Sequence, residues 1–182
     1  FMKADLGKIP IAGTFELTPR CTLDCKMCYI HKGICNKDVL SREKPAEWWL
    51  NLAEECKKRG TLNLLLTGGE PLVRSDFKEL YLKLREMGFL ININTNATLI
   101  DDEYIQFFKT YPPQKVNITL YGCSPETYAN LCGDGSAYEK VKYAIEGLKS
   151  NGVNIRINYT ITPLNKEDLS KAQAFANTLG VE

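Results

Sequence analysis

The alternation of short apolar segments with amphipathic helical patterns constrains the fold of this sequence more than any other feature. Five such pairs follow one another along the chain without an internal linker. Because consecutive strand–helix units join through crossovers of one hand, this order predicts an α/β domain with a parallel sheet. The predicted strands span residues 11–17, 62–66, 90–94, 116–120 and 153–161.

The predicted helices rest on apolar periodicity and on capping residues. The first helix spans residues 44–59 and has Pro45 in its first turn, where proline is tolerated. The other four helices are expected to begin at Ser75, at Asp101, at a capping box formed by Ser136 and Glu139, and at Asn165.

Polar residues alternate with apolar ones in the later strands. Ile91 and Ile93 alternate with Asn92 and Asn94, and the next two strands repeat this pattern. Strands covered on both faces are almost uniformly apolar, so we expect one face to pack against helices and the other to line a wet cavity. The predicted fold is a partial, open parallel TIM-like β/α barrel, truncated after about five β/α units. A sheet with one solvated face is the plainer alternative.

Length and charge exclude several classes of function. The 182 residues suit one domain, with an N-terminal extension at 1–10 and a core at 11–182. Lys plus Arg number 23 and Asp plus Glu number 22, so the net charge of +1 indicates neither a nucleic-acid nor a membrane partner. The longest apolar run, residues 27–30, is too short to cross a bilayer.

The cysteines indicate metal or redox chemistry. There are seven, an odd number, and no secretion signal precedes them, so we expect a reducing, cytoplasmic compartment. Cys21, Cys25 and Cys28 follow the first strand with the spacing C-x3-C-x2-C. Three thiolates in one loop can hold three irons of a [4Fe–4S] cluster and leave the fourth iron open. The alternative is a structural zinc site completed by His31 or Cys35.

The remaining cysteines are interpreted more simply. Cys56 falls on the apolar face of the first helix and is expected to be core packing. Cys123 and Cys132 flank the turn after the fourth strand and are expected to be loop or core residues. Cys35 and the single histidine, His31, are expected in a polar loop.

A glycine-rich turn follows the second strand. Gly68 and Gly69 let the backbone approach a ligand closely, and Glu70 brings a carboxylate to the same edge, where it could accept hydrogen bonds from an ammonium group. Active sites of parallel barrels lie at the C-terminal ends of the strands. The cysteine loop and this turn are therefore expected at one end of the sheet.

The two motifs, in this order and in register with the strands, resemble the radical SAM superfamily from about Phe15 to Thr162. The segments TPRCTLDCKMCYI, LLLTGGEPLVRSDFKELY, TNATLI and ITLYGCSPETYANLCGDGSAYEKV are similar to members that carry a C-terminal SPASM domain. Many of those members modify peptides or proteins.

The resemblance implies a role for individual residues. Cys21, Cys25 and Cys28 would hold a [4Fe–4S] cluster, whose open iron would bind S-adenosylmethionine. The implied cofactor-binding residues are Gly68, Gly69 and Glu70 for the methionine amino group, Asn96 and Thr119 for its carboxylate or the ribose, Arg156 and Asn158 beside the nucleoside, and Met27 and Tyr29 near the adenine. Met27 stands where the family usually has an aromatic residue. The stretch 128–133 lacks an arginine that some members use for the carboxylate, so Arg156 is one further candidate for that role.

The implied activity is reductive cleavage of S-adenosylmethionine to a 5′-deoxyadenosyl radical that abstracts hydrogen from a substrate. No catalytic residue beyond the cluster and this cofactor is implied. A peptide or protein substrate, as for a maturase-type oxidoreductase, is the first hypothesis. A small metabolite is the second, and a zinc-binding interaction module is the hypothesis from another class. The resemblance also implies an electron donor of flavodoxin or ferredoxin type.

The open barrel carries two further expectations. The fifth strand would be an exposed edge, and such edges pair with other chains, so we expect a weak dimer. We also expect this fragment to bind S-adenosylmethionine without performing the full reaction alone.

Overall fold

The computed structural model describes residues 7–30 and 43–181 and contains one sheet of five parallel strands in the order β1-β2-β3-β4-β5. The strands are β1 (Ala12–Glu16), β2 (Asn63–Thr67), β3 (Leu90–Thr95), β4 (Lys115–Thr119) and β5 (Ile155–Asn158). Every neighbouring pair is parallel. This arrangement confirms the α/β class and the open sheet, with β1 and β5 as its two edges in the described chain.

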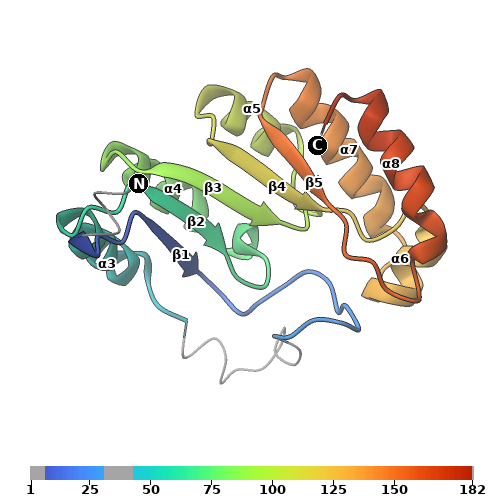
Figure 1. The fold of residues 1–182 in the computed structure, drawn as a ribbon, viewed down its shortest axis with the longest axis horizontal. Coiled ribbons are helices and arrows are strands. Elements are labelled where there is room, and N and C mark those ends of the chain that lie inside the picture. The colour runs from blue at the N-terminus through green and yellow to red at the C-terminus, as the bar shows by residue number, and fades with distance from the viewer. Residues whose placement is uncertain (1–6, 31–42, 182) are drawn as a thin grey trace.

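Helices follow each of the strands and lie on one side of the sheet (Figure 1). They are α3 (Ala46–Lys58), η1 (Pro71–Val73), α4 (Phe77–Glu86), α5 (Asp102–Thr110), α6 (Pro125–Cys132), α7 (Ala137–Ser150), η2 (Lys166–Asp168) and α8 (Leu169–Thr178). Within the described ranges, no helix combines the length and the apolar character needed to cross a bilayer.

The two faces of the sheet differ as the alternation predicts. Leu66, Ile93 and Ile118 are fully buried on the helical side and form part of the core. On the opposite face, Asn117 Nδ2 donates a hydrogen bond of 2.9 Å to Asn94 Oδ1 on the neighbouring strand. Amides on adjacent strands of the polar face thus bond to one another.

Strand β5 is shorter than the predicted 153–161. Val153 N bonds back to Leu148 O at the end of α7 instead of joining the sheet. Beyond the C-terminal end of the strand, Asn165 Nδ2 donates to Thr160 O at 2.9 Å, so this carbonyl bonds to a side chain and not to a neighbouring strand. Local hydrogen bonds therefore end the strand within a longer apolar pattern.

Only one of the four predicted caps forms. Asp101 accepts a hydrogen bond from Tyr104 N at 3.0 Å and caps α5 as expected. The predictions for Ser75, Ser136 and Asn165 are wrong, because none of these side chains caps a helix. Ser136 Oγ donates to Asp134 Oδ1, which competes with the capping box.

Helix α6 is an element that the apolar pattern did not predict. Ser124 caps it through a hydrogen bond from Thr127 N, Pro125 occupies its first turn, and Gly133 ends it with a φ of 78°. Ser-Pro before a short segment and a glycine after it are a recognisable start and stop. The helix is too short for its periodicity to stand out from the turn around it.

Candidate functional site

A cavity of about 330 Å³ lies at the C-terminal ends of the strands. The loops after β1, β2, β3 and β4 supply its walls. Most residues predicted for the site line it, namely Cys21, Cys25, Met27, Cys28, Tyr29, Gly68, Gly69, Asn96 and Thr119. The expectation that the cysteine loop and the glycine turn share one end of the sheet is confirmed.

The glycine turn is bound to the segment that leads into the cysteines. Gly69 N donates to Thr18 O at 2.8 Å, and Glu70 N donates to Arg20 O at 2.7 Å. A Cβ on Gly68 would lie 2.3 Å from Thr18 O, and a Cβ on Gly69 would lie 2.3 Å from Arg20 O. Both glycines are therefore required for the close approach between the glycine turn and residues 18–20. This requirement is separate from any approach of the turn to a ligand.

Glu70 lies behind this turn and does not line the cavity. Its side chain is fully buried. Leu72 N donates to Oε1 at 3.0 Å, Asn96 N donates to Oε2 at 2.7 Å, and Thr95 Oγ1 lies within 2.9 Å of both oxygens. The carboxylate therefore ties the end of β3 to the glycine turn.

Burial raises the pKa of Glu70 to about 7, although the hydrogen bonds from Asn96, Leu72 and Thr95 act in the opposite direction. The unfolded chain should titrate near its usual value of roughly 4.3. Between these two values the folded state holds more protons, so the free energy of unfolding should fall as pH rises.

A Glu70→Gln variant cannot titrate at this position, so comparison with it isolates the contribution of Glu70 to the pH dependence of stability. Relative to this variant, we expect the apo wild type to lose roughly 2–3 kcal/mol of stability between about pH 5 and 8. Urea unfolding of both proteins across this range measures the difference. Parallel pH profiles for the two proteins would contradict the raised pKa.

Cys21 and Cys25 occupy different surroundings. Asn96 Nδ2 lies 3.4 Å from Cys21 Sγ, and burial raises the pKa of the Cys21 thiol. The pKa of Cys25 is lowered, chiefly by a hydrogen bond from the Cys132 thiol and also by one from Tyr121. The loop is further held by Asp24 N, which donates to Cys132 O at 3.0 Å.

The donor set fits a [4Fe–4S] cluster. Three soft thiols line one cavity, yet among the described residues no three His, Cys, Asp or Glu side chains converge to hold a single metal ion. Each thiolate of such a cluster binds its own iron, so the ligands must surround the cluster instead of meeting at one point. His31 and Cys35, which would complete a zinc site, lie outside the described residues.

Besides Glu70, two further predicted residues do not line the cavity. Arg156 lies in a separate groove of the polar face with Lys115 and Asn154. Asn158 is exposed beside Thr119, its register partner. Strand β5 ends at Asn158, so Arg156 lies two residues before the C-terminal end of the strand.

Sequence reasoning did not assign Tyr121 to the cavity and did not find the contact between Cys132 and Cys25. Tyr121 lines the cavity, and Tyr128 Oη accepts a hydrogen bond from its backbone N at 3.2 Å. Cys132 is buried as expected for a core residue, but it also contacts Cys25. No local pattern marks this contact, because more than one hundred residues separate the two cysteines in the chain. Cys56, in contrast, packs against the core from α3, as predicted.

Comparison with known proteins places this site in a family. The sequence profile of the Radical SAM superfamily matches residues 15–177. The AdoMet-dependent heme synthase of Methanosarcina barkeri is 29% identical over 166 residues, which are 91% of this chain and 47% of that protein. The PqqA peptide cyclase of Granulibacter bethesdensis is 28% identical over 174 residues, which are 94% of this chain and 45% of that protein.

The fold has a close counterpart among solved structures. The crystal structure of Streptococcus suis SuiB bound to S-adenosylmethionine superposes with a TM-score of 0.78 at 21% sequence identity, covering 100% of this chain and 42% of that one. The chain spans about half the length of the curated relatives it matches. With the three-cysteine loop, the glycine turn and the profile match in agreement, the chain belongs to the radical SAM superfamily.

Proposed function

We propose that this chain is the core of a radical SAM enzyme, in which Cys21, Cys25 and Cys28 hold a [4Fe–4S] cluster. The observation that carries the proposal is that these three thiols and the Gly68–Gly69 backbone line one cavity at the C-terminal ends of parallel strands. When bound, such a cluster supplies the electron for reductive cleavage of S-adenosylmethionine. The role of the chain is to orient the cofactor and to exclude water.

The residues around the cavity supply contacts of the kinds that S-adenosylmethionine requires. Backbone groups of Gly68 to Glu70 suit the methionine amino group, because the Glu70 side chain is already engaged. Asn96 and Thr119 offer polar atoms for the carboxylate or the ribose, and Met27 and Tyr29 offer surface for the adenine.

Arg156 and Asn158 would have a more remote role. They could border the nucleoside only from outside the cavity described above. We retain them as proposed cofactor neighbours, with Asn158 nearer through its pairing with Thr119.

A peptide or protein is the proposed substrate, and a small metabolite is the second candidate. The sequence similarity to the PqqA peptide cyclase supports the first, and the similarity to the AdoMet-dependent heme synthase supports the second. We further propose a cytoplasmic location, an electron donor of flavodoxin or ferredoxin type, and a core at residues 11–182 after an extension at 1–10. The exposed edge at β5 supports a weak dimer.

Anaerobic reconstitution with iron and sulfide tests the proposal. We expect about four irons per chain and a broad thiolate-to-iron absorption band. Calorimetry should then show that the reconstituted protein binds S-adenosylmethionine, and a chemical reductant should release 5′-deoxyadenosine. One tightly bound zinc ion per chain with no iron would instead support the interaction module.

A further inference from the structure

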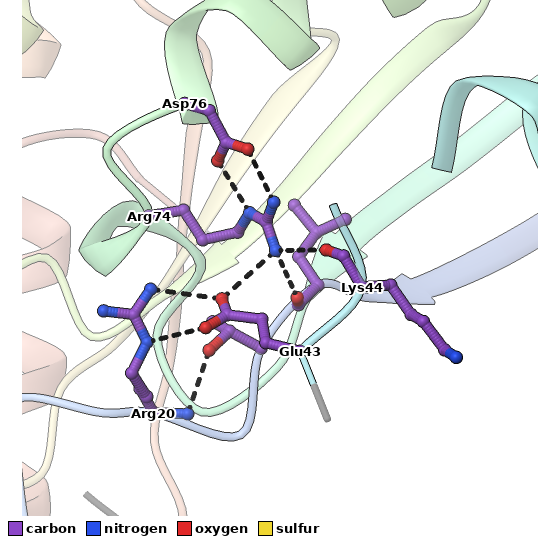
Figure 2. A network of polar contacts seen from close by, with 7 residues as sticks. Arg20, Glu43, Lys44, Arg74 and Asp76 are labelled. Carbon is purple, nitrogen blue, oxygen red and sulfur yellow. Dashed lines mark hydrogen bonds and ion pairs between the residues drawn. The ribbon is translucent and has the colours of Figure 1, made fainter. Parts of the chain in front are cut away.

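A network of two arginines and two carboxylates lies beside the cysteine loop, which we define as residues 18–30 (Figure 2). Arg20 donates from Nε to Glu43 Oε2 at 3.0 Å and from a terminal nitrogen to Glu43 Oε1 at 3.1 Å. Arg74 Nη1 donates to the same Glu43 Oε1 at 3.1 Å. Glu43 therefore joins the two guanidinium groups, and we call Arg20, Glu43 and Arg74 the arginine clasp.

Each guanidinium nitrogen of Arg74 donates at least one hydrogen bond. Its Nη1 also donates to Leu17 O and to Lys44 O, both at 3.0 Å. Its Nε and Nη2 bind the two carboxylate oxygens of Asp76 at 2.9 and 2.7 Å. A planar fork with fixed donors suits such a bidentate contact, and lysine could not reproduce it.

The position of the clasp in the chain gives it a role at the cysteine loop. Leu17 directly follows β1, and Arg20 lies at the start of the cysteine loop, where it directly precedes Cys21. Glu43 and Lys44 precede α3. Arg74 directly follows η1, the short helix into which the glycine turn leads. The clasp thus joins the entry to the cysteine loop, the approach to α3 and the glycine turn.

The backbone of Arg20 is held at the same point. Its N donates to Thr18 Oγ1 at 3.1 Å, and its O accepts from Glu70 N at 2.7 Å. The residue before Cys21 is therefore fixed through its N–H, its carbonyl and its side chain. Within the network, the side chains of Arg74 and Glu43 are only 4% and 12% exposed, so solvent weakens their ion pair little.

We propose that the arginine clasp positions the cysteine loop for its ligand, with Glu43 as the positioning residue that joins the two arginines. This proposal rests on the proposed function, because the ligand is the [4Fe–4S] cluster. Because the residue directly before Cys21 is already fixed, the cysteine loop has less conformational entropy to lose when it binds its ligand. The clasp should therefore restrict the thiols already in the protein without iron.

The test is cysteine reactivity in the apo-protein. Glu43→Ala separates Arg20 from Arg74 but leaves Arg74 on Leu17 O, Lys44 O and Asp76. We expect iodoacetamide to alkylate Cys21 and Cys28 about tenfold faster in this variant, as expected for the loss of hydrogen bonds between charged groups. Peptide mass spectrometry reports each cysteine, and Cys56 on α3 is the internal reference for global unfolding.

Two further variants complete the design. Glu79→Ala is the matched control, because it removes an exposed glutamate–lysine pair on α4, and it should leave the ratio of loop to Cys56 alkylation unchanged. Arg74→Lys keeps the charge but loses the bidentate geometry, and it should raise the ratio. After reconstitution, a chelator should remove iron about tenfold faster from Glu43→Ala than from the wild type.

The outcomes separate this proposal from the proposed function. An unchanged alkylation ratio in Glu43→Ala, or an equal increase at Cys56, would overturn the clasp even if iron and S-adenosylmethionine bind normally. If the wild type binds no iron but the ratio of loop to Cys56 alkylation rises in Glu43→Ala, the proposed function fails. The restriction of the cysteine loop by the clasp then still stands.

Discussion

Replacing Cys25 by alanine is expected to reduce the iron bound after anaerobic reconstitution from about four atoms per chain to nearly none. Cys25 is the middle cysteine of the C-x3-C-x2-C loop, and the residue is only 6% exposed. The neighbouring Cys132 is buried against it, on the end of α6. With two thiolates left in the loop, a cluster would lack one of its three proposed protein ligands. Iron and sulfide assays with the visible spectrum measure the loss.

Cys56→Ala provides the control for this experiment. Cys56 lies on α3, packs against the core and does not line the cavity. Its replacement should leave the iron content and the spectrum unchanged. Equal losses in the two variants would mean that reconstitution reports general cysteine content. Full iron content in Cys25→Ala would contradict the assignment of the three ligands.

Replacing Gly69 by alanine is expected to have the second large effect. The new Cβ would lie 2.3 Å from Arg20 O and 2.7 Å from Pro19 O, and real Cβ atoms do not approach backbone oxygens so closely. The glycine turn must therefore separate from the cysteine loop, which breaks the hydrogen bonds from Gly69 N and Glu70 N. We expect a loss of about 2–4 kcal/mol in urea unfolding and a weaker affinity for the cluster.

Gly13→Ala is the matched control, because Gly13 lies in β1 and its added Cβ would meet Leu64 at 3.4 Å, an ordinary contact. Neither glycine has a positive φ, so the two variants differ in steric room and not in backbone strain. Gly13→Ala should change stability by less than about 1 kcal/mol. Similar losses in both variants would show that the close approach at Gly69 is not the cause.

The local features of this fold could be predicted because they are repeated in the sequence. The period of two in β3 and β4 identified both the strands and their polar face, since each side chain of a strand points to the side opposite its neighbours. The order of strands and helices predicted parallel pairing, because a helix between two strands returns the chain to the same end of the sheet. The motifs after β1 and β2 then had to share one edge.

The start and end of elements were harder to predict, because short polar side chains have several possible partners. Asp101 caps α5, but Ser136 bonds to Asp134, and Asn165 bonds to Tyr121 O and Thr160 O. Each choice depends on which backbone groups lie nearby in three dimensions. The length of the fifth strand was overestimated for the same reason.

The sequence by itself thus determined the class of fold, the end of the sheet that carries the site, and the three cysteines that line it. Only the tertiary structure decided that Glu70 faces the end of β3, that Arg156 lies outside the cavity, and that Glu43 joins Arg20 to Arg74. The physical reason is the range of each interaction. Periodicity and turn chemistry act over a few residues, whereas these contacts join segments more than twenty residues apart, and they exist only once the strands have paired.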